Sequence, residues 1–324
     1  MIKIENLVKT YGNIHAVDHI SFEVNEGEIV GFLGPNGAGK TTTMNILTGC
    51  LSSTSGKAEI DGIDILEQPM EAKRRIGFLP EHPPLYLDMT VKEYLDFIYD
   101  IKHCTLNRQK HIREICEVVQ IQEVYKRIIR NLSKGYRQRV GIAQALVGNP
   151  KVIIFDEPTV GLDPKQIVEI RNLIRTLGRN HTVILSTHIL PEVSAVCERI
   201  VVIHKGKIIA NEKTEEIAEA AGGYRRLCLK VIGPARDVLN TLRKKQGITY
   251  AEILGEREAG STAFLVESAA GLDMRKPLFY ALAENGWPLI GMEAMGTNLE
   301  DVFLTLLDKQ EEKRRSRTRQ RSGT

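Results

Sequence analysis

A short glycine-rich stretch carries the chemistry that this sequence displays most clearly. Residues 34–41 read Gly-Pro-Asn-Gly-Ala-Gly-Lys-Thr, which fits the pattern G-x-x-x-x-G-K-[ST]. In such a loop, backbone N–H groups and a helix N-terminus surround phosphate oxygens, a lysine reaches the β- and γ-phosphates, and a hydroxyl binds Mg²⁺. The stretch therefore predicts a nucleoside triphosphate site in which Lys40 contacts phosphate and Thr41 contacts the metal.

Two carboxylates follow an apolar segment further along the chain. Residues 152–157 read Val-Ile-Ile-Phe-Asp-Glu, so Asp156 and Glu157 end a stretch that is typical of a buried parallel strand. Placed there, Asp156 would hold Mg²⁺, usually through water, and Glu157 would act as general base on the attacking water. A helix cap after a strand is the alternative interpretation of this pair. A phosphate loop alone is compatible with kinases, GTPases and many ATPases, so the later motifs must decide.

Strands and helices that alternate along the chain would position these residues. An apolar run at 28–33 leads into the glycine-rich loop, and a helix is expected at 41–47. The elements expected after it are strands at 76–79, 151–155 and 182–186 and helices at 134–147 and 164–177. This alternation predicts an α/β fold with a parallel, crossover-linked sheet and the nucleotide at the carboxyl ends of its strands.

Other segments are expected to surround that sheet. Residues 2–24 alternate between apolar and polar types, which indicates the strands of an antiparallel β layer with a turn at 11–13. Residues 199–210 read as a hairpin. Between 83 and about 148 the apolar residues recur at intervals of three and four, so a helical subdomain is expected there. Its aromatic residues are interpreted as internal packing, with a contact surface as the alternative.

The composition and charge limit the functions that are open to the chain. It has 324 residues, of which 42% are hydrophobic, and a net charge of +3. Six of the positive charges lie in the last twelve residues, so the rest carries −3 and no nucleic-acid partner is expected. The five cysteines form no C-x-x-C pair, which indicates reduced thiols. No stretch approaches the roughly 18 apolar residues of a membrane span, so membrane association is expected only through a partner.

A second domain is expected after the acidic, alanine-rich segment at 214–223. The pattern beyond it predicts strand 225–232, helix 236–246, strands 248–254 and 262–268, helix 274–285, strand 287–294 and a final helix at 298–307. This βαββαβ order is that of the split, ferredoxin-like arrangement. The expected organisation is an ATPase domain at 1–220, an α+β accessory domain at 221–310 and a disordered basic tail at 311–324. For the tail, a solvated end is favoured over contact with anionic lipid.

Six motifs, in the family's order, resemble the ATP-binding cassette (ABC) ATPases over residues 1 to about 220. They are Tyr11, the loop 34–41, the sequence Leu-Ser-Lys-Gly-Tyr-Arg-Gln at 132–138, the pair Asp156 and Glu157, the sequence Val-Gly-Leu-Asp at 160–163, and His188 after the strand at 182–186. The resemblance implies that ATP and Mg²⁺ are the ligands. It also implies that two chains enclose two ATP molecules, so that each site is incomplete in a single chain.

The resemblance implies a role for each matched residue. Tyr11 would stack on adenine, with packing at a strand end as the alternative. His188 would touch the γ-phosphate, with a capping or core histidine as the alternative. Asp163 would communicate across the dimer, and Ser133 and Gly135 would face the γ-phosphate of the second copy. The remaining phosphate ligands would be the backbone of Asn36, Gly37, Ala38, Gly39, Lys40, Thr41 and Thr42.

The chain departs from the family pattern in two places. Lys134 and Tyr136 stand where the family has a glycine and a glutamine, which affects the predicted ATP affinity at the dimer interface. Glu81 stands where the family usually has a glutamine that reaches Mg²⁺ and the water. We expect Glu81 to be a metal ligand and catalytic residue that faces the metal or swings out when the site is open, with a solvated loop carboxylate as the alternative.

The motifs together predict an ATP-hydrolysing motor subunit of a membrane exporter. It would act as a homodimer or with a sister ATPase, drive a separate membrane permease, and lie in the cytoplasm on the inner face of the cell membrane. The run from Pro80, residues 134–139 and residues 298–303 are similar to exporter ATPases of the drug-resistance, polysaccharide, copper-related and gliding-motility type. The alternatives are an importer ATPase, a soluble ABC protein acting on ribosomes or DNA, and a regulatory binding module.

Overall fold

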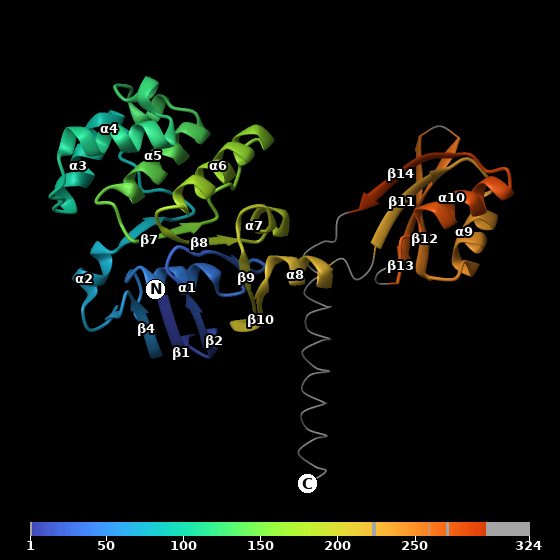
Figure 1. The fold of residues 1–324 in the computed structure, drawn as a ribbon, viewed down its shortest axis with the longest axis horizontal. Helices are drawn as coiled ribbons and strands as arrows, with labels where there is room; N and C mark the ends of the chain where they lie inside the picture. The colour runs from blue at the N-terminus through green and yellow to red at the C-terminus, as the bar shows by residue number, and fades with distance from the viewer. Residues whose placement is uncertain (1, 222–224, 259, 270–271, 296–324) are drawn as a thin grey trace, which may run out of the picture. The chain divides into compact units, whose positions relative to one another are not determined.

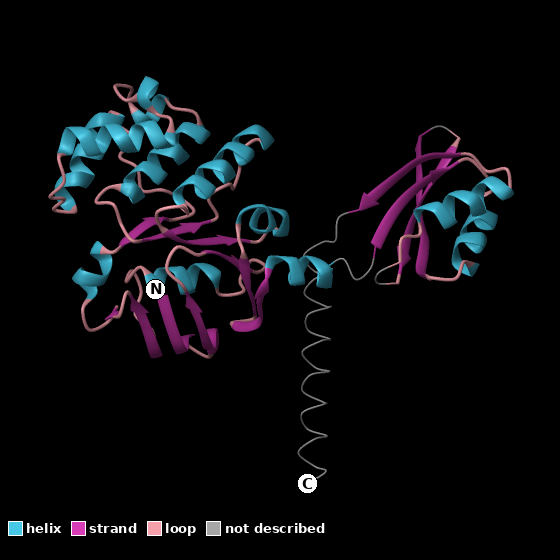
Figure 2. Cartoon of the chain, viewed as in Figure 1, coloured by secondary structure: helices cyan, strands magenta, loops and turns pink. Residues whose placement is uncertain are grey.

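The computed structural model describes residues 2–221, 225–258, 260–269 and 272–295. The chain forms two compact units, one up to Thr214 and one from Glu215 onward. Figure 1 follows the chain from end to end, and Figure 2 distinguishes its helices from its strands. None of the helices in these described ranges is both long and apolar enough to cross a bilayer.

A six-stranded sheet, in the order β10-β9-β3-β8-β7-β6, is the framework of the first unit. Its strands are β3 (Ile29–Leu33), β6 (Ile76–Leu79), β7 (Val152–Asp156), β8 (Thr182–Thr187), β9 (Arg199–His204) and β10 (Lys207–Lys213). All neighbouring pairs are parallel except β9 with β10, which form the expected hairpin. Every residue of β3, β7 and β8 is buried, as in a sheet covered on both faces. The predicted parallel α/β sheet is confirmed.

Helices cover both faces of this sheet (Figure 1). The helix α1 (Lys40–Leu47) lies on one side, and α5 (Lys134–Leu146), α6 (Pro164–Leu177) and α7 (Leu190–Val196) lie on the other. The bounds of α6 agree with the predicted helix at 164–177. The helix α7 and the short helix α2 (Pro69–Arg74) were not expected from the sequence.

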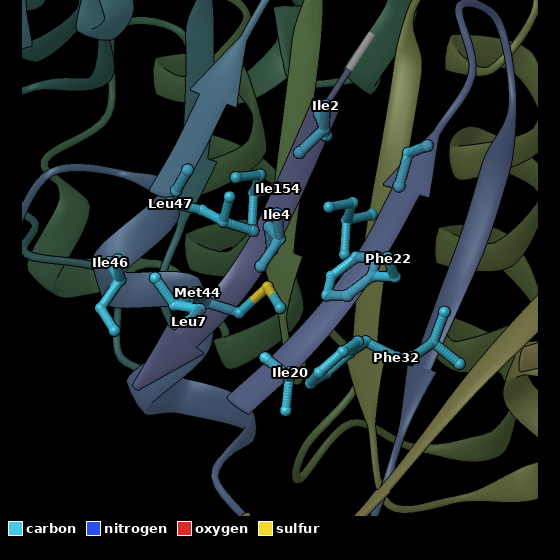
Figure 3. Close-up of a cluster of buried hydrophobic side chains, with 14 of the residues drawn as sticks. Ile2, Ile4, Leu7, Ile20, Phe22, Phe32, Met44, Ile46, Leu47 and Ile154 are labelled. Carbon is cyan, nitrogen blue, oxygen red and sulfur yellow. The ribbon is translucent and has the colours of Figure 1, made fainter. Parts of the chain in front are cut away.

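A second sheet of four strands, in the order β2-β1-β4-β5, is antiparallel and confirms the predicted β layer. Its strands are β1 (Ile2–Tyr11), β2 (Ile14–Val24), β4 (Ser55–Ile60) and β5 (Ile63–Asp64). Apolar side chains of β1 and β2, of α1 and of the parallel strands form one buried cluster (Figure 3). In it, Phe22 and Phe32 meet with ring centroids 5.4 Å apart. Each such buried side chain contributes about 1.5–3 kcal/mol to stability, so the cluster holds α1 between the sheets.

The helical insert contains α3 (Val91–Ile101), α4 (Arg108–Val119) and two 3₁₀ turns, Gln122–Val124 and Ile129–Asn131. A capping box fixes the start of α3, because the side chains of Thr90 and Glu93 each accept from the other's backbone N–H. The aromatic residues divide between the two interpretations: Tyr94 is 1% exposed, whereas Tyr86 is 53% exposed.

Within its described residues, the second unit is built around an antiparallel sheet. After α8 (Thr214–Ala221), the chain forms β11 (Arg225–Val231), α9 (Ala235–Lys244), β12 (Ile248–Glu258), β13 (Ser261–Ser268), α10 (Arg275–Glu284) and β14 (Leu289–Met295). The strand order is β12-β13-β11-β14. Leu229, Phe264, Val238 and Leu278 belong to a buried cluster of its own. The predicted helix at 298–307 and the basic tail lie outside the described residues.

Candidate nucleotide-binding site

The glycine-rich loop joins the end of β3 to the start of α1. Gly39 has a φ of +109°, and a Cβ on it would come within 2.4 Å of the Ala16 carbonyl oxygen. A Cβ on Gly34 would come within 2.5 Å of the Ile203 carbonyl oxygen. Only glycine fits this close backbone approach. Because no side chain among the described residues caps the N-terminus of α1, its first N–H groups are available to an anion.

The ammonium group of Lys40 lies inside the loop. Lys40 is 6% exposed, and its Nζ donates to the carbonyl oxygens of Gly34 at 2.8 Å and Pro35 at 3.3 Å. The same Nζ lies 3.2 Å from Oε1 of Glu157, the residue that follows β7. The sequence-predicted phosphate ligand and the sequence-predicted base therefore form a buried ion pair.

Glu157 also contacts His188, the residue that follows β8. His188 Nδ1 lies 3.0 Å from both carboxylate oxygens of Glu157, which is 5% exposed. Glu157 has a φ of +50°, and its N–H donates to the Ser186 carbonyl oxygen at 2.9 Å. A left-handed backbone costs a non-glycine residue about 1–3 kcal/mol and is typical of functional sites. The surrounding structure thus fixes the direction of this carboxylate.

Asp156, the last residue of β7, is 1% exposed. Burial raises the pKa of Asp156, and hydrogen bonds from the hydroxyls of Ser186 and Thr41 oppose that rise. The Ser186 bond to Oδ1 is 2.7 Å long. A hydroxyl and a carboxylate are hard oxygen donors, which is the set that Mg²⁺ takes from a protein when phosphates supply the rest. The residues present therefore fit the predicted metal.

One cleft of about 530 Å³ brings most of the predicted site residues together. Its lining consists of Ala16, Asn36, Gly37, Gly39, Lys40, Thr41, Thr42, Glu81, Glu157, Val160 and His188. Ala38 is buried and does not line the cleft; its carbonyl accepts from the N–H of Gly206. Tyr11 is also not in the lining. It is 50% exposed, and Lys9 Nζ lies 5.4 Å from its ring centroid.

Ser133, Gly135 and Asp163 line a different cavity of about 480 Å³. Ser133 caps α5 by accepting from the N–H of Tyr136, and Asp163 caps α6 by accepting from the N–H of Gln166. Within a single chain, the structure does not bring these residues to the cleft that contains Lys40.

Several polar residues at the site were not found from the sequence. Ser186 binds Asp156. Gln138, the last residue of the matched motif at 132–138, was given no role of its own, and its Nε2 donates to the Pro158 carbonyl oxygen at 2.8 Å. Thr159, Thr187 and Glu192 form a buried network next to the cleft. Within residues 182–192, the polar run Ser-Thr-His at 186–188 is the only sequence signal that could have indicated Ser186 and Thr187.

The fold and the cleft together define a class of protein. A parallel sheet, a glycine-rich loop before α1, and a buried acidic pair after β7 with a histidine beside it are the parts of a P-loop nucleoside triphosphatase. The antiparallel sheet and the helical insert are additions to that core.

Comparisons with known proteins narrow the class to a family. The family model described as ABC transporter matches residues 17–160. The chain is 41% identical to the bacitracin transport ATP-binding protein BcrA of Bacillus licheniformis, over 64% of this chain and 68% of that protein. It is 35% identical to the linearmycin resistance ATP-binding protein LnrL of Bacillus subtilis, over 94% of this chain and 98% of that protein.

A solved structure resembles the first unit. The ATP-binding cassette MJ0796, in a dimeric post-hydrolysis state bound to ADP and Pi, matches with a TM-score of 0.60 and 30% identity. The match covers 66% of this chain and 99% of that chain. The protein belongs to the ABC transporter family and is an ATP-binding, ATP-hydrolysing subunit of an ABC transporter.

Proposed function

We propose that this ATPase is the motor of an exporter. It would pair with a second copy or a sister ATPase around two Mg-ATP and drive a separate permease from the cytoplasmic face of the cell membrane. The contact of Lys40 and His188 with Glu157 in one cleft is the observation that carries the proposed chemistry. The direction of transport is supported by similarity to BcrA and LnrL, which are named for bacitracin transport and linearmycin resistance.

The residues of the cleft would divide the reaction among them. Phosphate oxygens would replace the carbonyls of Gly34 and Pro35 and the Glu157 carboxylate as partners of Lys40. Glu157 would then accept a proton from the attacking water, and His188 would hold that carboxylate in place and meet the γ-phosphate. Thr41 and Asp156 would hold Mg²⁺, which neutralises charge on the phosphate oxygens.

Two further residues complete the proposed site, one for the adenine ring and one for the metal. Tyr11, exposed at the end of β1, would stack on adenine. Glu81 is exposed and lines the cleft, which supports its proposed role as a ligand that turns toward the metal once nucleotide is bound. A Glu81→Gln variant is expected to change the Mg²⁺ dependence of turnover. If the Mg²⁺ dependence of turnover is unchanged, Glu81 is a solvated loop carboxylate without a metal role.

The separate cavity at Ser133 supports a composite site. The N-terminus of α5 would face the γ-phosphate bound by the other copy, because its dipole and N–H groups favour an anion. Gly135 would allow the backbone to come close, and Asp163 would connect the two sites. The similar cassette MJ0796 is dimeric in its state with ADP and Pi bound, which supports a two-chain arrangement.

A Glu157→Gln variant in Mg-ATP tests the composite site. Removing the base should lower turnover by about 10²–10⁴-fold while leaving both nucleotide sites able to close. Light scattering after gel filtration should therefore show dimers with Mg-ATP and monomers without it. The control is Lys40→Ala, which should give monomers in both conditions. Monomers of Glu157→Gln at saturating Mg-ATP would contradict the proposal.

We also propose that the second unit is a ferredoxin-like accessory domain at about 221–310. Its βαββαβ order and the strand order β12-β13-β11-β14 support this assignment. The proposed ATPase domain at 1–220 precedes it, and the basic tail at 311–324 follows it.

A further inference from the structure

A buried carboxylate beside the cleft has no part in the roles proposed above. Glu192 lies in the first turn of α7 and is 2% exposed. Its Oε2 accepts from the hydroxyl of Thr159 at 2.7 Å and from the hydroxyl of Thr187 at 3.0 Å. Both threonines are themselves buried. Because all three side chains are shielded from water, a hydroxyl that lost this acceptor would be left unsatisfied, which costs about 1–3 kcal/mol.

The two threonines belong to the two segments that carry the reacting groups. Thr159 lies two residues after Glu157, in the loop that leaves β7. Thr187 ends β8 and comes directly before His188, and its Oγ1 also accepts from the N–H of Ile189. Glu192 therefore joins the base-carrying segment to the histidine-carrying segment through one oxygen atom.

The base-carrying loop is also attached on a second side. Gln138 of α5 donates to the carbonyl oxygen of Pro158, directly between Glu157 and Thr159. The N–H of Glu157 donates to Ser186 of β8. With Glu192 in place, the segment 157–159 is thus held at three successive residues, which explains how the left-handed backbone of Glu157 is maintained.

We infer that Glu192 is a positioning residue for ATP hydrolysis. Through Thr159 and Thr187 it keeps Glu157 and His188 in the orientation that gives their 3.0 Å contacts. This inference rests on the proposed roles of Glu157 and His188. A displacement of a catalytic group by about 1 Å costs roughly 10²-fold in rate, so loss of the network should slow the chemical step. ATP binding should be spared, because the hydrogen bonds of Glu192 go to the two threonines and not to Lys40 or the glycine-rich loop.

Two substitutions at Glu192 separate positioning from other effects. In Glu192→Leu no acceptor remains for either hydroxyl, so we expect kcat to fall about 10–100-fold while KM for ATP changes less than about twofold. In Glu192→Gln the amide oxygen can accept both hydroxyls, and we expect at least about a third of kcat to remain. Steady-state turnover with Mg-ATP measures both. Equal loss in the two variants would overturn the inference.

Thr182→Val is the matched control. Thr182 lies on the same strand as Thr187, is 2% exposed, and accepts a 2.9 Å hydrogen bond from the N–H of Gly27. Its substitution should lower the melting midpoint and leave kcat per folded molecule unchanged. Thr187→Val should lower both. If Thr187→Val and Thr182→Val have the same effect, the network serves stability alone and the inference is wrong.

Further variants keep the test decisive. If Glu192→Leu does not fold, Thr159→Val and Thr187→Val remove the same bonds one at a time. Their double mutant should lose less activity than the two single losses combined, because both act through Glu192. Glu157→Gln tests the underlying assignment separately. If it abolishes turnover while the Glu192 and threonine variants do not slow it, only the positioning role fails; if it stays active, the proposed function itself fails.

Discussion

Glu157 combines three features that rarely occur in one residue. It is buried, it has a left-handed backbone, and its carboxylate contacts both Lys40 and His188. A buried carboxylate is costly unless it is paired and hydrogen-bonded, and here two neighbours meet that requirement. The consequence is that His188 already orients the carboxylate in the free chain, while the contact with Lys40 must be exchanged for phosphate before the carboxylate can act as a base.

A second carboxylate gives a test of stability against pH. Glu28 precedes β3, and Arg199 at the start of β9 donates to it at 2.7 and 2.9 Å. Burial raises the pKa of Glu28, but the bonds from Arg199 and Asn25 outweigh it, so the pKa lies below its ordinary value. The unfolded chain then binds the proton more readily. The stabilisation is complete above about pH 4.3 and is lost as the pH falls through the depressed pKa.

We therefore expect Glu28→Gln to lower the melting midpoint at pH 7. The difference from the parent protein should shrink as the pH falls below about 4.3 and through the depressed pKa of Glu28, because the carboxyl group of the parent protein is then neutral, like the glutamine of the variant. Thermal unfolding, followed by circular dichroism at pH 7 and at a pH below about 4.3, checks this. Glu26→Gln, at an exposed position two residues earlier, is the control and should change the midpoint little. A difference that stays constant with pH would contradict the assignment.

Single residues also show where prediction from the sequence ends. The places of the glycine-rich loop, Asp156 and Glu157 in the fold were predictable, because close backbone approach requires glycines at fixed spacing and the acidic pair directly follows a buried apolar strand. Glu192 was not, because its partners lie 33 and 5 residues away and any buried threonine pair would serve equally well. The interpretation of Tyr86 as packed inside holds only in part, because its ring contacts Phe97 and Tyr94 while the residue is 53% exposed.

At the scale of elements, α5 is held at both ends. Ser133 caps its first turn, and Lys102, directly after α3, donates to the carbonyl oxygens of Gln144, Ala145 and Val147 at its last turn. Carbonyls in the last turn of a helix lack the usual N–H partner four residues on, although that of Gln144 also accepts from the N–H of Val147 at 3.3 Å, and a cation is the favourable charge there. Lys102 thereby joins α3 to the helix whose start carries Ser133.

Lys102→Met is expected to lower the free energy of unfolding by about 1–3 kcal/mol, because the carbonyls lose a charged donor in a buried place. Lys92→Met removes an exposed pair with Asp96 on the same helix and should cost about 0.3–0.5 kcal/mol. Urea unfolding of both variants measures the difference. If the two variants cost the same, the contact of Lys102 with α5 adds no stability.

The lengths of the elements explain which of them could be predicted. The strands β3, β7 and β8 are short apolar runs; the glycine-rich loop follows β3, and polar residues end β7 and β8. The helix α6 has fourteen residues with a proline at its start, so both kinds of element gave clear signals. The helix α7 has seven residues and α2 has six, which is too few for a helical period to show. The helix α7, which carries Glu192, was therefore not predictable from the spacing of apolar residues.

At the scale of the whole molecule, the proposed catalytic parts lie in two cavities of the same chain. A mixture of two inactive variants tests whether copies complete each other. In Lys40→Ala the glycine-rich loop lacks its proposed phosphate-binding lysine. In Ser133→Arg a large side chain blocks the N-terminus of α5. A dimer containing one of each has one site with both parts intact, so mixing should restore activity that neither variant shows alone.

ATPase assays of the mixture at several ratios measure this recovery, which should be greatest near equal amounts. Each variant assayed alone at the same total concentration is the control. Turnover of the mixture that equals the weighted mean of the two variants would show that each chain acts by itself.

The engagement of Lys40 has a consequence for ligand selection. Its ammonium group already has three oxygen partners inside its own chain, so an incoming anion competes with an internal one. A single phosphate or sulfate ion gains little from that exchange. A triphosphate would meet the loop amides, Lys40 and the proposed metal ligands at once, and these contacts would together offset the loss of the contact between Lys40 and Glu157. We therefore expect a single phosphate or sulfate ion to bind this loop much more weakly than a nucleoside triphosphate does.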